Sequence, residues 1–282
     1  MFSGQGKSGF RMTKLHADQV AVITGGASGI GFALAEALVR KGLRVALADQ
    51  NRDALRAAAD RLDKSGRSVL AVQTDVSDRD SMRSLRDNVV LHFGRADLVC
   101  NNAGIFSSVG PIWELDADHW RRLFEVNYWG VVHGIREFMP LLIKRGSGHV
   151  VNTASMSGLS IVAGTADYVS AKHAVVSLSE ALRADLDAGG LQAIGVTVVC
   201  PGAVRTDFGD YALKLMNSKL NPKHRMTSTL QRHVLEVEEL AQATVRGIEQ
   251  DALFVTPTRG SRERVMSRLE PLLAAISKES GD

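Results

Sequence analysis

The feature that most constrains the fold of this chain is the regular alternation of short apolar runs with longer segments of helical periodicity. Several runs are almost continuously apolar, which is typical of parallel strands covered on both faces. The predicted strands are residues 20–24, 45–48, 69–73, 98–101, 149–153, 196–200 and 253–255. The predicted helices are residues 30–41, 52–64, 81–93, 119–144 and 168–187. This pattern predicts an α/β domain with a doubly wound, seven-stranded parallel sheet and helices on both faces.

Composition excludes several classes of protein. Of the 282 residues, 45% are hydrophobic and 23% are charged, which is ordinary for a soluble chain with a core. The net charge of +3 gives no electrostatic case for a nucleic-acid partner. Cys100 and Cys200 each end an apolar run, and we expect both to be reduced. No stretch reaches the ~20 apolar residues of a membrane span, so we expect a cytoplasmic protein without a membrane partner.

The chain shows no internal boundary. We expect one domain over residues 17–258, a disordered N-terminal extension over residues 1–16 that lacks the apolar core of a secretion signal, and a helical C-terminal tail over residues 259–282. The segment 206–232 is long for a connection in a compact domain, and such segments are often lids or binding loops. It follows the sixth predicted strand, so we expect it to form a substrate lid.

A glycine-rich turn, TGGASGIG, follows the first predicted strand at residues 24–31. Glycine at positions 25, 29 and 31 permits a tight turn and close approach of the backbone to a pyrophosphate. The helix that follows presents free N–H groups and the positive end of its dipole to such an anion. A bare strand-to-helix turn is the alternative interpretation, but the position of the turn in the first strand–turn–helix unit favours a dinucleotide.

An acidic residue, Asp49, ends the second predicted strand, 18 residues after Gly31. A carboxylate at this place can accept hydrogen bonds from both ribose hydroxyls of adenosine, and it would repel a 2′-phosphate. The glycine turn carries Ser28 and no basic residue. We therefore expect NAD rather than NADP, although Arg52 lies close enough in sequence to leave an NADP-dependent ketoreductase as an alternative.

A tyrosine and a lysine at helical spacing suggest proton chemistry. Of the three tyrosines, only Tyr168 has a lysine four residues later, Lys172, and this spacing places both on one helix face. A neighbouring ammonium group lowers the pKa of a phenol, which is otherwise ~10. Ser155 follows the fifth predicted strand and could hold a substrate oxygen beside the phenol. The alternative is a half-exposed tyrosine beside a surface lysine.

Taken together, the motifs resemble those of the short-chain dehydrogenase/reductase family, over about residues 17–258. The matching motifs are TGGASGIG, Asp75-Val76, Asn101-Asn102-Ala103-Gly104, Asn127, Ser155, Tyr168-Val-Ser-Ala-Lys172 and Pro201-Gly202-Ala-Val-Arg-Thr206. The resemblance implies a Rossmann-like domain and an oxidoreductase that interconverts a secondary alcohol and a ketone. In that family, hydride passes between the substrate carbon and the nicotinamide.

The resemblance also implies residue roles. Tyr168 would be the general acid/base, Lys172 would lower its pKa and bind the nicotinamide ribose, and Ser155 would hydrogen-bond the substrate oxygen. Asn127 would hold a water that links Lys172 to solvent. The implied cofactor contacts are Gly25, Ser28, Gly29, Ile30, Gly31, Asp49, Asp75, Val76, Asn102, Ala103, Gly104, Tyr168, Lys172, Pro201, Gly202, Val204 and Thr206. A homotetramer is implied as well, with the helices at 121–144 and 168–187 in one dimer contact.

Two further expectations concern ligands. No two of the scattered histidines have the spacing of a helical metal site, so we expect no metal. The expected substrate contacts are Ser155, Met156, Tyr168 and Tyr211, beside apolar side chains at Phe106, Trp113, Ile161 and Val162. We see no arginine or lysine placed for a substrate carboxylate or phosphate, and so expect a hydrophobic small-molecule alcohol or ketone. A non-catalytic sensor of dinucleotides is the alternative, but it would not need the serine, tyrosine and lysine.

Overall fold

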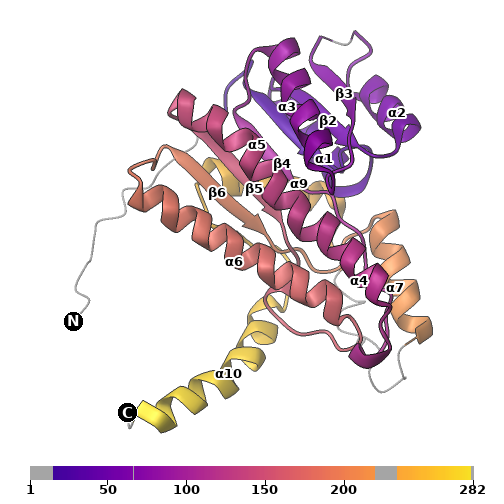
Figure 1. Cartoon of the computed structure of the whole chain (residues 1–282), viewed down its shortest axis with the longest axis vertical. Coiled ribbons are helices and arrows are strands. Elements are labelled where there is room, and N and C mark those ends of the chain that lie inside the picture. Colours follow the sequence, from indigo (N-terminus) through magenta and orange to yellow (C-terminus); the bar gives the residue numbers. More distant parts are fainter. Residues whose placement is uncertain (1–14, 66, 220–233, 281–282) are drawn as a thin grey trace.

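The computed structural model describes residues 15–65, 67–219 and 234–280, and its centre is a parallel sheet (Figure 1). The strands are β1 (Val20–Thr24), β2 (Arg44–Asp49), β3 (Val69–Gln73), β4 (Leu98–Asn101), β5 (Gly148–Thr153), β6 (Ile194–Val199) and β7 (Phe254–Val255). Their order in the seven-stranded sheet is β3-β2-β1-β4-β5-β6-β7, and every neighbouring pair is parallel. The predicted doubly wound α/β fold is therefore confirmed.

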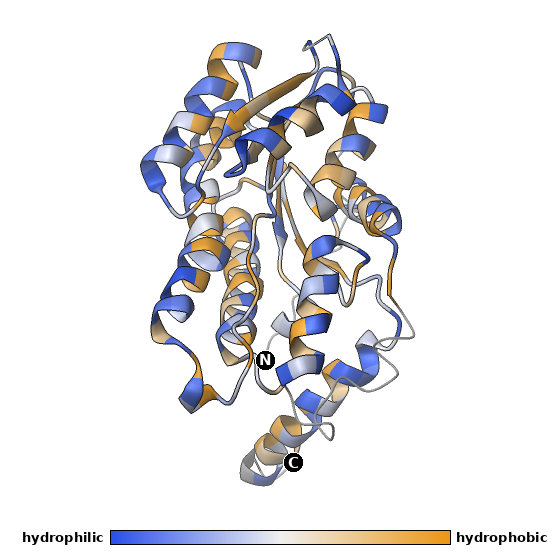
Figure 2. Ribbon diagram, turned by 90° about the vertical axis from the view of Figure 1, so that its right-hand side faces the viewer, coloured by the Kyte–Doolittle hydropathy of each residue, from blue (hydrophilic) through white to orange (hydrophobic). Residues whose placement is uncertain are grey.

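Helices cover both faces of the sheet. The helices α1 (Gly29–Arg40), α2 (Arg52–Leu62) and α9 (Val237–Glu249) pack on one face, and their apolar side chains share one core with alternate strand residues. The helices α3 (Arg79–Phe93), α5 (Gly130–Arg145) and α6 (Ala166–Ala188) pack on the other. Figure 2 shows hydrophobic strand segments between helices that carry both hydrophobic and hydrophilic residues. The near-continuous apolar strand sequences follow from this burial on both faces.

The long helix predicted at residues 119–144 is interrupted. The structure contains α4 (Ala117–Phe124), then a π-helical turn (Glu125–Trp129), then α5. The Gly130 N–H donates to the Glu125 carbonyl, a spacing of five residues. A side chain at Gly130 would meet Val76 Cγ2 at 2.8 Å, so this glycine lets the helix pass close to the loop after β3. Asn127 lies within the wide turn, a feature that is often associated with functional sites.

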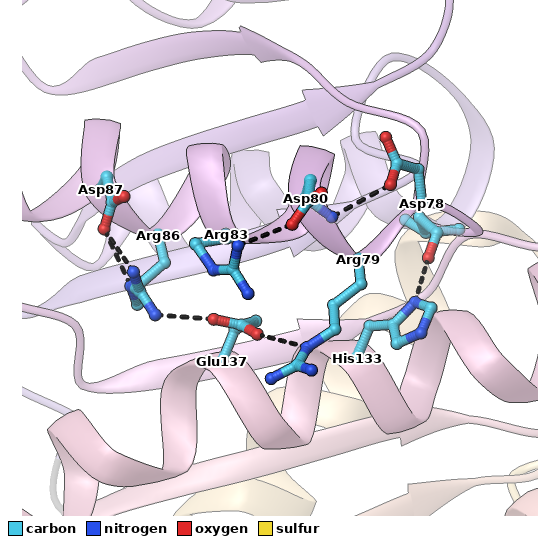
Figure 3. Close-up of polar contacts among 9 residues, drawn as sticks. Asp78, Arg79, Asp80, Arg83, Arg86, Asp87, His133 and Glu137 are labelled. Atoms are coloured by element: carbon cyan, nitrogen blue, oxygen red, sulfur yellow. Dashed lines mark hydrogen bonds and ion pairs between the residues drawn. The ribbon is translucent and has the colours of Figure 1, made fainter.

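Charged side chains join α3 to α5, as Figure 3 shows. The Glu137 carboxylate is buried, and it accepts hydrogen bonds from Arg79 Nε at 3.2 Å and Arg86 Nη1 at 2.6 Å. His133 Nδ1 lies 2.9 Å from the Val76 carbonyl oxygen. These contacts fix the position of α5, and with it the π-helical turn at its N-terminus.

The part of the chain after β6 contributes helices α7 (Asp207–Lys219) and α10 (Ser261–Ser280) near the carboxyl edge of the sheet. Helix α7 follows β6 directly, and α10 extends away from the body of the molecule (yellow in Figure 1). Of the predicted lid at 206–232, the residues 220–232 lie outside the described residues, as do residues 1–14 of the predicted N-terminal extension. In the described part of the chain, no helix is long and apolar enough to cross a membrane, and no cluster of three or more histidine, cysteine or acidic residues could hold a metal ion.

The two helices that the family resemblance places in a dimer contact also pack within the chain. Of their apolar residues, Val131, Phe138, Val175 and Val176 are buried, whereas Val132, Ile135 and Leu178 are half-buried.

Candidate active site

The order of the strands places a crevice at the carboxyl edge of the sheet. The chain proceeds outward from β1 to β2 and β3 in one direction, and from β4 to β7 in the other. Ligands of open α/β sheets bind where the order reverses, beyond the carboxyl ends of the strands. A cavity of about 290 Å³ lies there. It is lined by Gly25, Ser28, Gly29, Ile30, Asp49, Asn102, Ala103, Gly104, Phe106, Thr153, Ala154, Ser155, Met156, Ser157, Val162, Thr165, Tyr168, Lys172, Pro201, Gly202, Ala203, Val204, Thr206, Asp207, Phe208, Gly209, Ala212, Leu213, Met216 and Arg264.

The glycine turn between β1 and α1 forms one end of the cavity. Gly25 has φ +63°, and a side chain there would lie 2.9 Å from Ala103 Cα. A side chain at Gly31 would meet the Gly25 carbonyl oxygen at 2.2 Å, so this glycine permits the helix to pack on the turn. Ser28 is the N-cap residue of α1, but its side chain makes no capping hydrogen bond. The first N–H groups of α1 thus lack a capping side chain, which suits the binding of a pyrophosphate.

Asn102 connects this turn to the neighbouring strands. Its backbone N–H donates to Thr24 Oγ1 at 2.9 Å, and its Nδ2 donates to the Thr24 carbonyl at 3.1 Å. Thr153 Oγ1 at the end of β5 donates to Asn102 Oδ1 at 3.2 Å. The side chain of Asn102 therefore holds the ends of β1, β4 and β5 together, while its neighbours Ala103 and Gly104 line the cavity.

Asp49 ends β2 and lines the cavity beside the glycine turn. Its carboxylate accepts hydrogen bonds from the N–H groups of Ala27 at 3.3 Å and Asn51 at 3.0 Å. These bonds fix the orientation of the negative charge. Arg52 is exposed in the first turn of α2 and does not line the cavity.

The predicted catalytic side chains meet at the middle of the cavity. Tyr168 and Lys172 lie one turn apart on α6, with Lys172 Nζ 5.6 Å from the centre of the Tyr168 ring. Burial raises the pKa of Tyr168 to about 12, and a hydrogen bond with Ser155 opposes part of this rise. Burial lowers the pKa of Lys172 to about 8, and its ammonium group donates to the Thr153 carbonyl at 2.9 Å.

The expected lowering of the Tyr168 pKa by Lys172 is not found in this structure, because the burial of the phenol outweighs any such effect. The phenol is therefore protonated at neutral pH. In this state it is a proton donor, and it needs additional positive charge nearby to act as a base.

Asn127 lies behind the cavity wall. Its side chain is fully buried, accepts from the Ile105 N–H at 2.8 Å and donates to the Ile105 carbonyl at 2.9 Å. A side chain at Gly104 would lie 3.2 Å from Asn127 Oδ1 and 3.7 Å from Lys172 Nζ, so Gly104 separates the two. The side chain of Asn127 thus positions the loop after β4.

Apolar side chains form the other end of the cavity. The Phe106 ring lies 5.0 Å from that of Tyr168 and 5.9 Å from that of Phe208, measured between ring centres. Met156, Val162 and Met216 add to this wall. Two residues that we expected here, Trp113 and Ile161, are 81% and 64% exposed and do not line it.

Five predicted site residues lie outside the cavity. Tyr211 is 58% exposed, because α7 turns Ala212 and Met216 inward instead. The Asp75 carboxylate accepts hydrogen bonds from Ser77, and Val76 is buried against α5. Gly31 and Asn127 support the wall from behind, as described above.

Sequence reasoning missed several lining residues, which are Thr153, Ala154, Ser157, Thr165, Ala203, Asp207, Phe208, Gly209, Ala212, Leu213, Met216 and Arg264. Most adjoin predicted residues in sequence and follow from the ends of β5 and β6. Arg264 does not, since it comes from α10, and it corrects our expectation that no basic residue is placed near the substrate. Nothing in the local sequence distinguishes it from the other basic residues of this helix.

Comparisons with known proteins agree with this geometry. Residues 19–214 match the short chain dehydrogenase family. The chain is 34% identical to the 1-deoxy-11-beta-hydroxypentalenate dehydrogenase of Streptomyces avermitilis over 92% of each chain. It is 31% identical to the cyclohexanol dehydrogenase of an Acinetobacter strain, over 85% of this chain and 91% of that protein. A short-chain dehydrogenase/reductase from Burkholderia phymatum, crystallised with NAD, superposes with a TM-score of 0.80 at 32% identity and covers 95% of this chain and 97% of its own.

The match spans the glycine turn, the serine and the tyrosine–lysine pair, all of which the fold brings to one cavity. Its relatives are dehydrogenases that act on CH–OH groups. The chain belongs to the short-chain dehydrogenase family, and it is an NAD(P)-dependent oxidoreductase of that type.

Proposed function

We propose that this protein interconverts a hydrophobic secondary alcohol and the corresponding ketone, with NAD as its cofactor and Tyr168 as the general acid/base. One observation carries the proposal: a single cavity joins the uncapped N-terminus of α1 to the Ser155, Tyr168 and Lys172 side chains, and then to an apolar wall. The names of two relatives, a cyclohexanol dehydrogenase and a hydroxypentalenate dehydrogenase, agree with a ring-bearing substrate.

The side chains of this protein transfer the proton to and from the substrate oxygen. In the direction of reduction, the neutral Tyr168 phenol donates its proton to the carbonyl oxygen, while the Ser155 hydroxyl hydrogen-bonds the same oxygen. In the direction of oxidation, the phenol must first lose its proton, which its burial opposes; the ammonium group of Lys172 on the next turn would be part of the positive charge that this loss requires. Lys172 would also bind the nicotinamide ribose, and a water held at Asn127 would connect it to solvent. When bound, the cofactor would supply the hydride chemistry: NADH would be the hydride donor in reduction, and NAD would be the hydride acceptor in oxidation.

The choice of NAD over NADP rests on Asp49. Its carboxylate lines the cavity beside the glycine turn, where the adenosine ribose would lie, and it would repel a 2′-phosphate. The nearest candidate counter-charge, Arg52, does not line the cavity. We expect Asp49→Ser to narrow the preference for NAD in kcat/KM by at least about tenfold, which corresponds to about 1.4 kcal/mol. Equal efficiency with both cofactors before mutation would contradict this assignment.

The role of Tyr168 is tested by Tyr168→Phe, with Tyr211→Phe as the matched control. Removal of the phenolic proton should abolish turnover of a cyclic secondary alcohol such as cyclohexanol, measured by NADH absorbance, while NAD binding by calorimetry stays within about twofold. The exposed ring of Tyr211 lies outside the cavity, so its variant should keep full activity. Activity of Tyr168→Phe within tenfold of the unmutated protein would refute the assignment. NAD binding without turnover of any alcohol by the unmutated protein would indicate a sensor instead.

The location and assembly are also part of this proposal. Cys100 and Cys200 are both free and buried, which suits a reducing compartment such as the cytoplasm. The resemblance to the family supports a homotetramer, for which the outer surfaces of α5 and α6 are the candidate contact.

A further inference from the structure

One cationic side chain of the cavity has no part in the proposed reaction. Arg264 lies in the first turn of α10 and lines the cavity. Its Nη2 donates to Ser160 Oγ at 2.9 Å, and Ser160 Oγ in turn donates to the Met156 carbonyl at 2.9 Å. Met156 directly follows Ser155, so Arg264 is tied to the loop that carries the substrate-binding serine. The glycine turn that would receive the pyrophosphate leaves the sheet at a different strand.

Among the described residues, the guanidinium group of Arg264 has no anionic partner. No ion pair joins Arg264 to these residues, whereas another partly buried arginine, Arg183 on α6, is paired with Asp251. Asp207 also lines the cavity, but it is exposed and makes no ion pair with Arg264. Burial without a counter-charge lowers the pKa of Arg264 from its ordinary value. Partly buried cations are normally paired, so this one is suited to an anion that enters the cavity.

We propose that Arg264 is a specificity-determining residue that binds a carboxylate carried by the substrate, at a point of the substrate remote from the carbon that reacts. Four of the five N–H donors of the guanidinium group are not used by Ser160, and a planar fork of donors matches a carboxylate. The apolar surfaces of Phe106, Val162 and Met216 would hold the ring between the two polar ends. The proposed substrate is then a cyclic hydroxy acid or keto acid, and this refinement rests on the proposed function.

The first test compares a ring-hydroxylated cyclohexanecarboxylate with its primary amide, in the presence of NAD. The unmutated protein should prefer the acid, and Arg264→Met should reduce kcat/KM for the acid by about tenfold to a hundredfold while leaving the amide within about twofold. Arg264→Gln should lose the same preference, although glutamine can still donate to Ser160. The matched control is Arg262→Met, which removes an exposed arginine from the same turn and should leave kcat/KM unchanged for both substrates.

The second test measures binding alone, so that it does not depend on turnover. With NADH present, cyclohexanecarboxylate should bind more tightly than cyclohexanecarboxamide in calorimetry, and Arg264→Met should remove this difference. If the carboxylate does not bind, or binds equally well to the variant, the role of Arg264 is refuted while the proposed function stands. If the carboxylate binds through Arg264 but no alcohol is oxidised, the proposed function fails and the anion site stands. If Arg264→Met and Arg264→Gln each lose kcat/KM equally for the acid and the amide, then Arg264 only fastens α10 to Ser160.

Discussion

The burial of Lys172 makes a prediction about stability that is separate from catalysis. Burial lowers the pKa of Lys172 from 10.5 to about 8, and this shift reduces the free energy of unfolding at pH 7 by about 3 kcal/mol. Replacement of Lys172 by methionine removes this cost, but it leaves the Thr153 carbonyl without its donor, which costs about 1 kcal/mol. We therefore expect Lys172→Met to be inactive and yet more stable than the unmutated protein by about 2 kcal/mol at pH 7.

The sign of the pH dependence is the sharper test. Between pH 8 and 10.5 the unfolded chain binds a proton at Lys172 that the folded chain does not, so the stability of the unmutated protein gains about 1.4 kcal/mol per pH unit from this group. The variant lacks this contribution, and its advantage should vanish near pH 10. Urea unfolding of both proteins without cofactor, from pH 7 to 10, measures the difference. The exposed Lys214→Met serves as a control that should show no such trend. A difference between Lys172→Met and the unmutated protein that is constant across this range would refute the reasoning.

Three further predictions concern packing and assembly. Gly31→Ala should destabilise the fold by about 3 kcal/mol in thermal unfolding and weaken NAD binding at least tenfold, because the new Cβ would meet the Gly25 carbonyl oxygen. In the control Gly110→Ala, the new Cβ makes only ordinary contacts, and the stability should change by less than about 0.5 kcal/mol. Glu137→Ala should lower the free energy of unfolding in urea by about 2 kcal/mol, because the buried Glu137 carboxylate binds two arginines of α3. The control Asp80→Ala removes an exposed ion pair and should have little effect. Equal losses of stability in the two variants would contradict the importance of burial. Light scattering at micromolar concentration should give the mass of a tetramer, and a monomer would contradict the assembly inferred from the family resemblance.

The central layers of the fold could be predicted because strands that are buried on both faces have continuously apolar sequences. Val20, Ala21, Val22 and Ile23 are apolar in succession, as expected for a parallel strand that is covered on both faces. The π-helical turn around Asn127 could not be predicted, since helical periodicity continues through it. At the end of the turn, Gly130 lies close to Val76, and these two residues are far apart in sequence.

The candidate site also has a part that could be predicted from the sequence and a part that could not. Ser155, Tyr168 and Lys172 stand at fixed spacings at the end of β5 and on one turn of α6, so their proximity follows from local geometry. The apolar wall depends on the rotation of α7 about its axis, which the sequence leaves open because both faces of that helix carry apolar residues. Tyr211 was therefore expected inside and lies outside. Arg264 escaped prediction because its contact with Ser160 joins residues 104 positions apart in the chain.

The separate origins of the two ends of the cavity affect how such a protein can diverge. The residues proposed for catalysis and cofactor binding are positioned by β1 to β6 and α6. Arg264 instead comes from α10, a helix that extends from the body and has no fully buried residue over 261–278. Substitutions in that helix place little of the sheet's stability at risk. A substitution at Arg264 alone is therefore expected to shift the preference between a hydroxy acid and a neutral alcohol, with little effect on the sheet that holds the rest of the cavity.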